Sequence, residues 1–200
     1  MEEAGKNWSD NVNTVNIERR VALEKRRRVA EMSPEDMRRL LLTSEVTGLP
    51  NRRAFDEAGV APAVAMSDLD GLKALNDRYG YDVGDAFLRA KADALREVGL
   101  EAYHDKGDEF LCRGNNVGEL MAKLECARAI LRNRTVVVEG VDVETLRLKG
   151  GDFSYGVGND LDEAEMSLKQ RKTEREINGE LERGKLCGIR IRDDAETRDR

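Results

Sequence analysis

Apolar residues recur at helical spacing in the middle and near the end of the chain. Between Val83 and Val98 they fall three or four positions apart, which predicts an amphipathic helix that ends at Gly99. The same spacing predicts a helix from Val117 to Leu131. A last long helix is expected from Asp160 to Ile177.

Short apolar or β-branched runs lie between these helices and predict strands. Val64 to Met66 leads into the acids Asp68 and Asp70, which indicates a buried strand with carboxylates at its end. Two further runs flank Lys106-Gly107, which predicts a tight hairpin because glycine tolerates positive φ. The other predicted strands are 136–143, with a turn at Glu139-Gly140, 153–157 and 185–192. The fold class is therefore α/β (α+β), with a central mixed, mostly antiparallel sheet flanked by helices.

The first forty residues differ from the rest in their charge density. Residues 14–32 predict a helix with interleaved basic and acidic side chains, and Ser33-Pro34 begins a second helix. We expect a helical extension at 1–39, one domain at 40–180 and a tail at 181–200. The first helix is interpreted as solvated, with pairing of two subunits or contact with nucleic acid as alternatives.

Composition narrows the functional classes. Charged residues make up 37% and aromatic residues 4% of the chain, so the core must be mostly aliphatic. A net charge of -6 argues against a protein that binds nucleic acid by bulk electrostatics. No apolar stretch is long enough for a bilayer and no signal peptide is recognisable, so we expect no membrane contact and a cytoplasmic location. The cysteines Cys112, Cys126 and Cys187 are not closely paired, and reduced thiols are expected.

Carboxylates provide the candidate chemistry. Asp68 and Asp70 follow one strand, and Asp108 and Glu109 stand beside the hairpin turn. Carboxylates that converge from neighbouring strands are ligands for Mg²⁺, together with substrate phosphates. The pattern by itself is also typical of solvated acids at strand ends.

Three motifs, in order along residues 40–172, resemble the GGDEF (diguanylate cyclase) family. They are Thr47-Gly48-Leu49-Pro50-Asn51-Arg52-Arg53, Asp68-Leu69-Asp70-Gly71-Leu72-Lys73 with Asn76-Asp77 and Gly84-Asp85, and the variant signature Lys106-Gly107-Asp108-Glu109-Phe110. Their joint occurrence is far more specific than any one of them. The resemblance implies the palm-like nucleotide-cyclase fold.

The resemblance also assigns roles by position. Asp68 and Asp108 match the ligands of two Mg²⁺ (or Mn²⁺) ions per active site, and Leu69 matches a ligand that contributes its carbonyl. Asp108 and Glu109 match residues needed for catalysis, and the match leaves two roles open for Glu109: a metal ligand, or a group that helps to deprotonate the attacking 3′-hydroxyl. The remaining matches contact substrate: Asn76 and Asp85 at the guanine, Lys73 and Lys172 at the phosphates, and Leu72.

The implied reaction condenses two GTP molecules into cyclic di-GMP and releases pyrophosphate. Each domain holds one GTP, so a homodimer is needed for catalysis. The alternative is a degenerate module that binds GTP or cyclic di-GMP and regulates a partner without turnover.

Several positions depart from the family pattern. Lys106 replaces the first signature glycine, and Glu176 replaces an arginine that follows the phosphate-binding lysine, with Arg175 as a possible substitute. The inhibitory product site would fall on Glu97 and Leu100, so no feedback through it is expected. Structural roles are expected for three other residues: Asp70 and Asp77 as braces of the turn and helix, and His104 as an ordinary strand residue.

Overall fold

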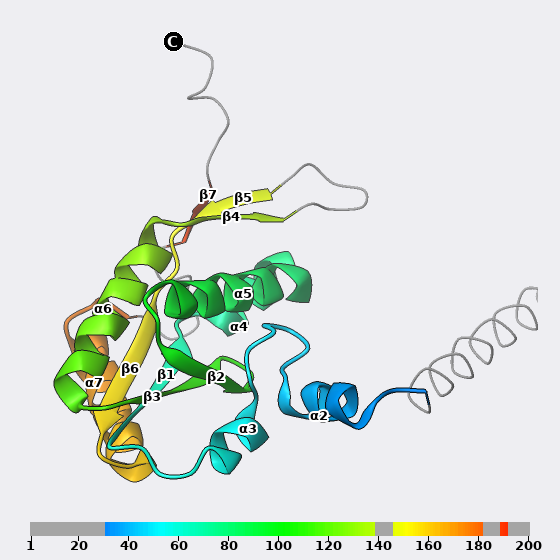
Figure 1. The fold of residues 1–200 in the computed structure, drawn as a ribbon. Helices are drawn as coiled ribbons and strands as arrows, with labels where there is room; N and C mark the ends of the chain where they lie inside the picture. The colour runs from blue at the N-terminus through cyan, green and yellow to red at the C-terminus, as the bar shows by residue number, and fades with distance from the viewer. Residues whose placement is uncertain (1–30, 139–145, 182–188, 192–200) are drawn as a thin grey trace, which may run out of the picture. The chain divides into compact units, whose positions relative to one another are not determined.

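A four-stranded antiparallel sheet organises the second of two units of the chain, residues 42–200 (Figure 1). The computed structural model describes residues 31–138, 146–181 and 189–191. The first unit comprises residues 1–41. Its described part holds most of helix α2 (Pro34–Leu42), where Ser33 accepts a hydrogen bond from the Asp36 amide, as predicted for an N-cap. The helix predicted for 14–32 lies almost entirely outside the described residues.

The sheet has the strand order β2-β3-β1-β6. Its strands are β1 (Ala63–Leu69), β2 (Glu101–Lys106), β3 (Glu109–Gly114) and β6 (Phe153–Gly158). All three strand pairings are antiparallel, and a parallel bridge joins Asn51 to His104. The predicted mostly antiparallel sheet is confirmed. The hairpin turn comprises Gly107 and Asp108, one residue later than the predicted pair.

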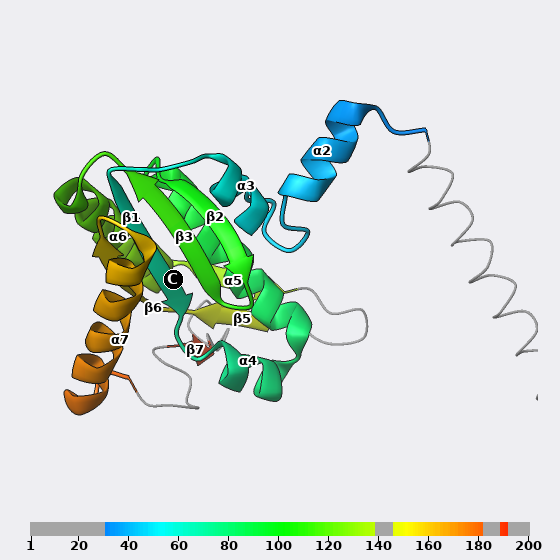
Figure 2. The same cartoon turned by 90° about the horizontal axis from the view of Figure 1, so that it is seen from below.

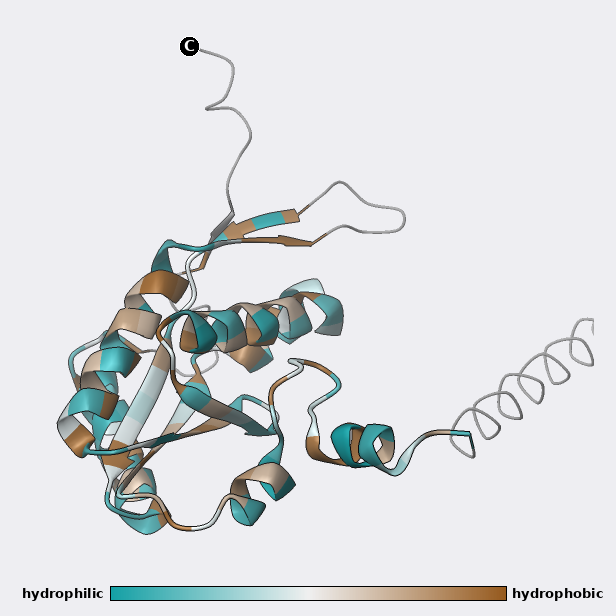
Figure 3. Ribbon diagram, viewed as in Figure 1, coloured by the Kyte–Doolittle hydropathy of each residue, from teal (hydrophilic) through white to brown (hydrophobic). Residues whose placement is uncertain are grey.

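One face of the sheet carries the main core. Helices α5 (Tyr81–Glu97) and α6 (Val117–Asn133) pack on this face, and α4 (Leu72–Tyr79) precedes α5. Both packing helices were predicted from their apolar spacing, and Figure 3 shows hydrophobic and hydrophilic residues around each of them. The backbone of Gly99 has a φ of 67° and follows the end of α5, as predicted.

The opposite face of the sheet is covered only in part. Helix α7 (Leu161–Ile177) lies along β6, and the short helix α3 (Arg52–Glu57) lies near β2 (Figure 2). A Cβ atom on Gly156 would stand 2.1 Å from the amide nitrogen of Leu168 in α7. Glycine at this position therefore lets the helix backbone lie directly on the strand, which fixes the side chains that α7 directs at the end of β1.

A second, three-stranded antiparallel sheet was not predicted as a separate unit. It consists of β4 (Thr135–Val138), β5 (Leu146–Lys149) and β7 (Arg190–Ile191), in that order. The predicted strand 136–143 and its turn extend into residues 139–145, and the strand predicted at 185–192 begins in 182–188. Both of these segments lie outside the described residues.

Two further expectations concern cysteine and membrane contact. Cys112 is buried and Cys126 is exposed, both as free thiols, while Cys187 lies outside the described residues. Burial raises the pKa of the Cys112 thiol to about 12, so this thiol is inert at neutral pH. None of the helices in the described part of the chain combines the length and the apolar character that crossing a membrane requires.

Candidate functional site

The signature hairpin is anchored to the end of β1. Its turn residue Gly107 has a φ of 55°, a conformation that glycine adopts without strain. The carbonyl of the next residue, Asp108, accepts a hydrogen bond of 3.2 Å from the amide of Leu69. The turn thus holds the Asp108 side chain next to the last residues of β1.

His104 braces the same turn from within the sheet. Its Nε2 lies 3.0 Å from the carbonyl oxygen of Gly107, and its Nδ1 lies 2.7 Å from the hydroxyl of Ser44. A carbonyl only accepts, so Nε2 carries the proton and the Ser44 hydroxyl donates to Nδ1. Burial lowers the pKa of His104, which favours this neutral form. The predicted role as an ordinary strand residue is too modest, because His104 positions the turn.

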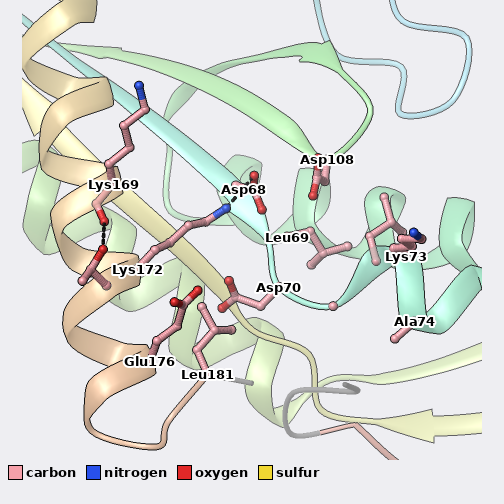
Figure 4. A pocket seen from close by; sticks show the side chains of 13 residues that line it. Asp68, Leu69, Asp70, Lys73, Ala74, Asp108, Lys169, Lys172, Glu176 and Leu181 are labelled. Carbon is pink, nitrogen blue, oxygen red and sulfur yellow. Dashed lines mark hydrogen bonds and ion pairs between the residues drawn. The ribbon is translucent and has the colours of Figure 1, made fainter. Parts of the chain in front are cut away.

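A cleft of about 410 Å³ opens between the end of β1, the signature turn and α7 (Figure 4). Carboxylates and lysines face each other across it. Six of the predicted site residues line it: Asp68, Leu69, Leu72, Lys73, Asp108 and Lys172. The rest of its lining comprises the buried Asp70 and Leu181, together with Gly71, Ala74, Lys169, Thr173 and Glu176.

Two carboxylates of like charge meet in this cleft. Burial and the neighbouring Asp68 side chain raise the pKa of Asp108 to about 6. On the other side of Asp68, the Lys172 ammonium lies 2.8 Å from its carboxylate (Figure 4). The site therefore concentrates negative charge, which a single lysine from α7 partly balances.

The oxygen atoms of the cleft fit a hard divalent cation whose remaining ligands are substrate phosphates and water. Within the described residues there is no group of three or more histidine, cysteine or acidic side chains that could hold a metal. Asp68 and Asp108 offer carboxylate oxygens, and Leu69, whose carbonyl is the third expected ligand, lines the same cleft. Magnesium commonly uses one or two carboxylates together with phosphates and water, so the two carboxylates suffice for a substrate-bound metal.

The predicted guanine contacts lie beside the cleft and not in its described lining. The Oδ1 atom of Asn76 is buried and has no hydrogen-bond partner among the described residues. A Cβ atom on Gly84 would stand 1.8 Å from that oxygen, so the Asn76 side chain packs directly on the helix turn that carries Asp85. A buried acceptor without a donor is unusual in proteins and is consistent with a site for a ligand N–H group. The guanine-binding role of both residues stays a prediction.

Glu109 also lies outside the described lining of the cleft. Its Cα is paired with that of Asp68 across β1 and β3, which places both side chains on the same face of the sheet. The Lys106 ammonium lies 3.6 Å from the Glu109 carboxylate, and the Lys106 side chain is 76% exposed. The bulky lysine of the variant signature thus projects to solvent beside the turn, and the part of the cleft wall that the structure describes does not include it.

Arg175 does not replace the missing phosphate-binding arginine, and that prediction is wrong. Its side chain is only 7% exposed, and its guanidinium lies 2.6 Å from Asp70 and 2.7 Å from Asp152. These contacts direct it under the cleft and away from substrate. Glu176, the next residue, lines the cleft instead.

Asp70 has a structural role, as expected, but its side chain braces β6 and α7 and not the turn and helix that follow β1. It is buried, and it accepts a hydrogen bond of 2.9 Å from the Ser154 hydroxyl in addition to its pairing with Arg175. Arg128 and Arg132 both bind Asp152, so two acids and three arginines form one network beneath the site. The arginines lower the pKa of Asp152 against the effect of its burial. This cluster joins β6, α6 and α7 to the end of β1.

Comparison with known families agrees with this geometry. The family model described as diguanylate cyclase, GGDEF domain, matches residues 42–175, which is more than half of the chain. The chain belongs to the GGDEF domain family. The matched region includes the signature hairpin, all the predicted site residues and the cleft lining up to Thr173, while Glu176 and Leu181 lie beyond it.

Curated relatives match the GGDEF domain over part of their length. The diguanylate cyclase VdcA of Vibrio cholerae is 42% identical over 79 residues, which cover 34% of this chain and 23% of VdcA. The cyclic di-GMP phosphodiesterase PdeR of Escherichia coli is 33% identical over 115 residues, or 50% of this chain and 17% of PdeR. The chain thus spans well under half the length of these relatives, whose names cover two opposite activities.

Solved structures share the fold of this GGDEF domain. The diguanylate cyclase SiaD of Pseudomonas aeruginosa, solved with its activator SiaC, has a TM-score of 0.55 at 24% identity, covering 83% of this chain and 78% of that one. The coiled coil and GGDEF domain of DgcB from Caulobacter crescentus, in complex with c-di-GMP, has a TM-score of 0.53 at 21% identity, covering 84% and 95%. At these identities the likeness confirms the fold alone.

Two supporting features of the GGDEF site were not predicted. Gly156, which admits α7, gave no signal beyond its place in a strand. Lys91 did give a signal in the sequence, because it falls between Phe87 and Leu95 at intervals of four on the apolar face of α5. A lysine on that face is buried against the core and needs a reason.

Proposed function

We propose that the chain is a diguanylate cyclase that condenses two GTP molecules into cyclic di-GMP and releases two pyrophosphates. The observation that carries this proposal is the meeting of Asp68 and Asp108 in a cleft that also presents Lys73 and Lys172. Carboxylates for a metal beside lysines for phosphates are the groups that phosphoryl transfer requires. Membership of the GGDEF family supports the same reaction class.

The residues of the cleft divide the work on the triphosphate. When bound, Mg²⁺ or Mn²⁺ would stabilise the charge on the phosphates and lower the pKa of the attacking hydroxyl. Asp68 and Asp108 would hold the cation together with the Leu69 carbonyl. Lys73 and Lys172 would bind the negative phosphate oxygens, which requires Lys172 to exchange its contact with Asp68 for one with substrate.

Selection of guanine is assigned to Asn76 and Asp85. Guanine offers N–H donors on its Watson–Crick edge, and the unpartnered Oδ1 of Asn76 and the carboxylate of Asp85 are acceptors. Adenine has a bare acceptor at the corresponding ring nitrogen, so the same pair would leave acceptors facing each other. GTP is therefore the proposed substrate over ATP.

The bond change takes place between two substrates. The 3′-hydroxyl of one GTP attacks the α-phosphate of the other, the bond to the departing pyrophosphate breaks, and the second linkage forms by the same exchange. One cleft holds one GTP, so two chains would face each other as a homodimer. Glu109, on the same sheet face as Asp68, is proposed to assist as a carboxylate near the attacking hydroxyl.

One observation favours a second function, a module that binds nucleotide without turnover. Glu176 stands in the cleft wall where the family pattern has an arginine, and it would repel phosphates. The variant signature residue Lys106 also forms an ion pair with Glu109. In this alternative the domain binds GTP or cyclic di-GMP and regulates a partner.

The test is incubation of the full chain at high concentration with GTP and Mg²⁺ or Mn²⁺, followed by separation of the nucleotides. Formation of cyclic di-GMP that is lost in Asp108→Asn and Glu109→Gln supports the cyclase. GTP binding without product, in wild type and in Glu176→Arg alike, would replace it with the regulatory module. Product from Glu176→Arg alone would identify Glu176 as the substitution that silences the site.

A further inference from the structure

A lysine is completely buried directly beneath the carboxylate cleft. Lys91 belongs to α5 and has an exposed fraction of 0%. Its ammonium is enclosed by two aromatic rings, 4.2 Å from the centroid of Phe110 and 5.1 Å from that of Phe153. Lysine is rarely buried to this degree unless a partner balances its charge.

The partners of Lys91 are the groups of the site itself. Its Nζ donates a hydrogen bond of 3.3 Å to the carbonyl oxygen of Asp108. The negative charges of Asp68 and Asp108 contribute most to stabilising the protonated form of Lys91, and Asp70 contributes less. The hydrogen bond goes to a backbone oxygen, so the charge of Lys91 is balanced by these nearby acids and by the two aromatic faces.

The surroundings of the ammonium suit a cation. It lies against the faces of two aromatic rings and donates to the Asp108 carbonyl, and both kinds of contact favour a positive charge at this position. Unlike Lys172, which reaches in from α7 and is 30% exposed, Lys91 cannot move out to solvent.

We propose that Lys91 is a built-in counter-ion of the Asp68–Asp108 pair and that it weakens the affinity of this pair for a divalent cation. The proposal rests on the metal site of the proposed function and deepens it. Lys91 is a positioning residue, since it acts through Asp108 and lies outside the cleft lining. Its charge lets the two carboxylates stay close together without metal, and a substrate that brings its own phosphates then completes the cation's coordination.

Two substitutions separate the charge from the hydrogen bond. Lys91→Met keeps an unbranched side chain, one heavy atom shorter, between the two aromatic rings and removes both properties. Lys91→Gln has a similar length to methionine, removes the charge and keeps an N–H donor that can point toward the Asp108 carbonyl. Lys123→Met is the matched control, because it makes the same change in a lysine of α6 that pairs with Glu119 outside the site.

The measurement is Mn²⁺ binding to the full chain at pH 7 without nucleotide. Binding is detected by electron paramagnetic resonance, as the loss of the signal of free Mn²⁺. Each protein is also prepared with Asp108→Asn, so that only binding that depends on Asp108 is counted. Both Lys91 variants should bind Mn²⁺ about tenfold more tightly than wild type, since a nearby positive charge has been removed. Lys123→Met should bind as wild type does.

The outcomes separate this inference from the proposed function. Unchanged or weaker Mn²⁺ binding in both Lys91 variants, with binding still dependent on Asp108, overturns the counter-ion role and leaves the metal site intact. Weaker binding in Lys91→Met with wild-type binding in Lys91→Gln shows that only the hydrogen bond matters and also overturns it. If no Mn²⁺ binding depends on Asp108 in any protein, the metal site of the proposed function fails and the inference fails with it.

Discussion

Asp68 and Asp70 stand two residues apart in one motif, yet their surroundings are opposite. Asp70 is 4% exposed and is held by Arg175 at 2.6 Å and by the Ser154 hydroxyl at 2.9 Å. Asp68 faces the cleft, with Lys172 at 2.8 Å on one side and the like charge of Asp108 on the other. One carboxylate is saturated by partners, and the other is not.

The comparison shows that charge compensation separates the structural carboxylates of this domain from those of the candidate site. A buried carboxylate is tolerated only when cations and donors compensate it, and the arginine network beneath the cleft does so. The cleft instead brings two carboxylates together, and the pKa of Asp108 rises to about 6 as a result. Repulsion between two carboxylates in a cleft that is also lined by lysines is typical of a binding site.

The largest expected effect concerns the network. Arg175→Met leaves Asp70 without its cation, and we expect a loss of about 3–5 kcal/mol in the free energy of unfolding because a buried charge becomes unpaired. Urea denaturation at pH 7 measures this loss. Arg132→Met is the control, since this arginine binds the same Asp152 with half of its side chain exposed, and its loss should stay below about 1 kcal/mol. Equal losses in the two variants would contradict the distinction.

Replacing each of the two aspartates by asparagine, in separate variants, extends the comparison from stability to catalytic activity. We expect Asp68→Asn to reduce metal-dependent pyrophosphate release from GTP by roughly 10²–10³-fold with little change in stability, because a ligand of the proposed metal is lost. Asp70→Asn should lower the melting temperature and retain turnover in the folded fraction. The reverse pattern would show that the motif's roles are assigned to the wrong residues.

A smaller effect is expected at the guanine contact. Gly84→Ala places a Cβ atom where the Asn76 Oδ1 now lies, so the side chain must turn away. The KM for GTP should rise about tenfold, the size of one lost hydrogen bond, while kcat and the melting temperature change little. Gly118→Ala in α6, where the atom nearest to the new Cβ is the Asn116 Oδ1 at 3.6 Å, provides a control for replacement of a helical glycine outside the site. An unchanged KM in Gly84→Ala would remove Asn76 from recognition.

The smallest effect is the pH dependence of stability. The folded chain holds the Asp108 proton more tightly than the unfolded chain, so protonation stabilises the fold at low pH. This benefit is lost as the pH rises from about 4 through 6, and above pH 6 the ionised carboxylate is a net cost. In EDTA, Asp108→Asn should melt a few degrees above wild type at pH 7.5, about 1 kcal/mol after solvent screening, and the gap should narrow at pH 5. A gap that is equal at both pH values would contradict the raised pKa.

Local sequence patterns account for the elements that could be predicted. Apolar spacing defined α5 and α6, and Gly107 marked the hairpin because its conformation is a local property. Motif order then placed Asp68 and Asp108 in one site. The helix and turn signals lie within a few residues of the feature that they predict, whereas motif order relates positions that are far apart in the sequence.

Long-range packing accounts for what could not be predicted. Arg175 points into the protein because it binds Asp70, which lies 105 residues earlier in the sequence. No local sequence pattern distinguishes an arginine with such a buried partner from one that contacts phosphate. The second sheet was missed for a similar reason. Its middle strand β5 has only four residues, two of them basic, and was not predicted, and only the pairing of β4, β5 and β7 separates this sheet from the first. Lys91 combines both cases: its place on the apolar face was visible, but its partners were not.

The central claim is that the cleft binds GTP through a metal on Asp68 and Asp108. The direct measurement is calorimetric binding of the α,β-methylene analogue of GTP, which cannot release pyrophosphate, to wild type and to Asp108→Asn, in Mn²⁺ and in EDTA. The account predicts tight binding to wild type only in Mn²⁺, with loss of that binding in Asp108→Asn and weaker binding of the adenosine analogue. Equal affinity in EDTA, or an unchanged affinity in Asp108→Asn, would contradict it.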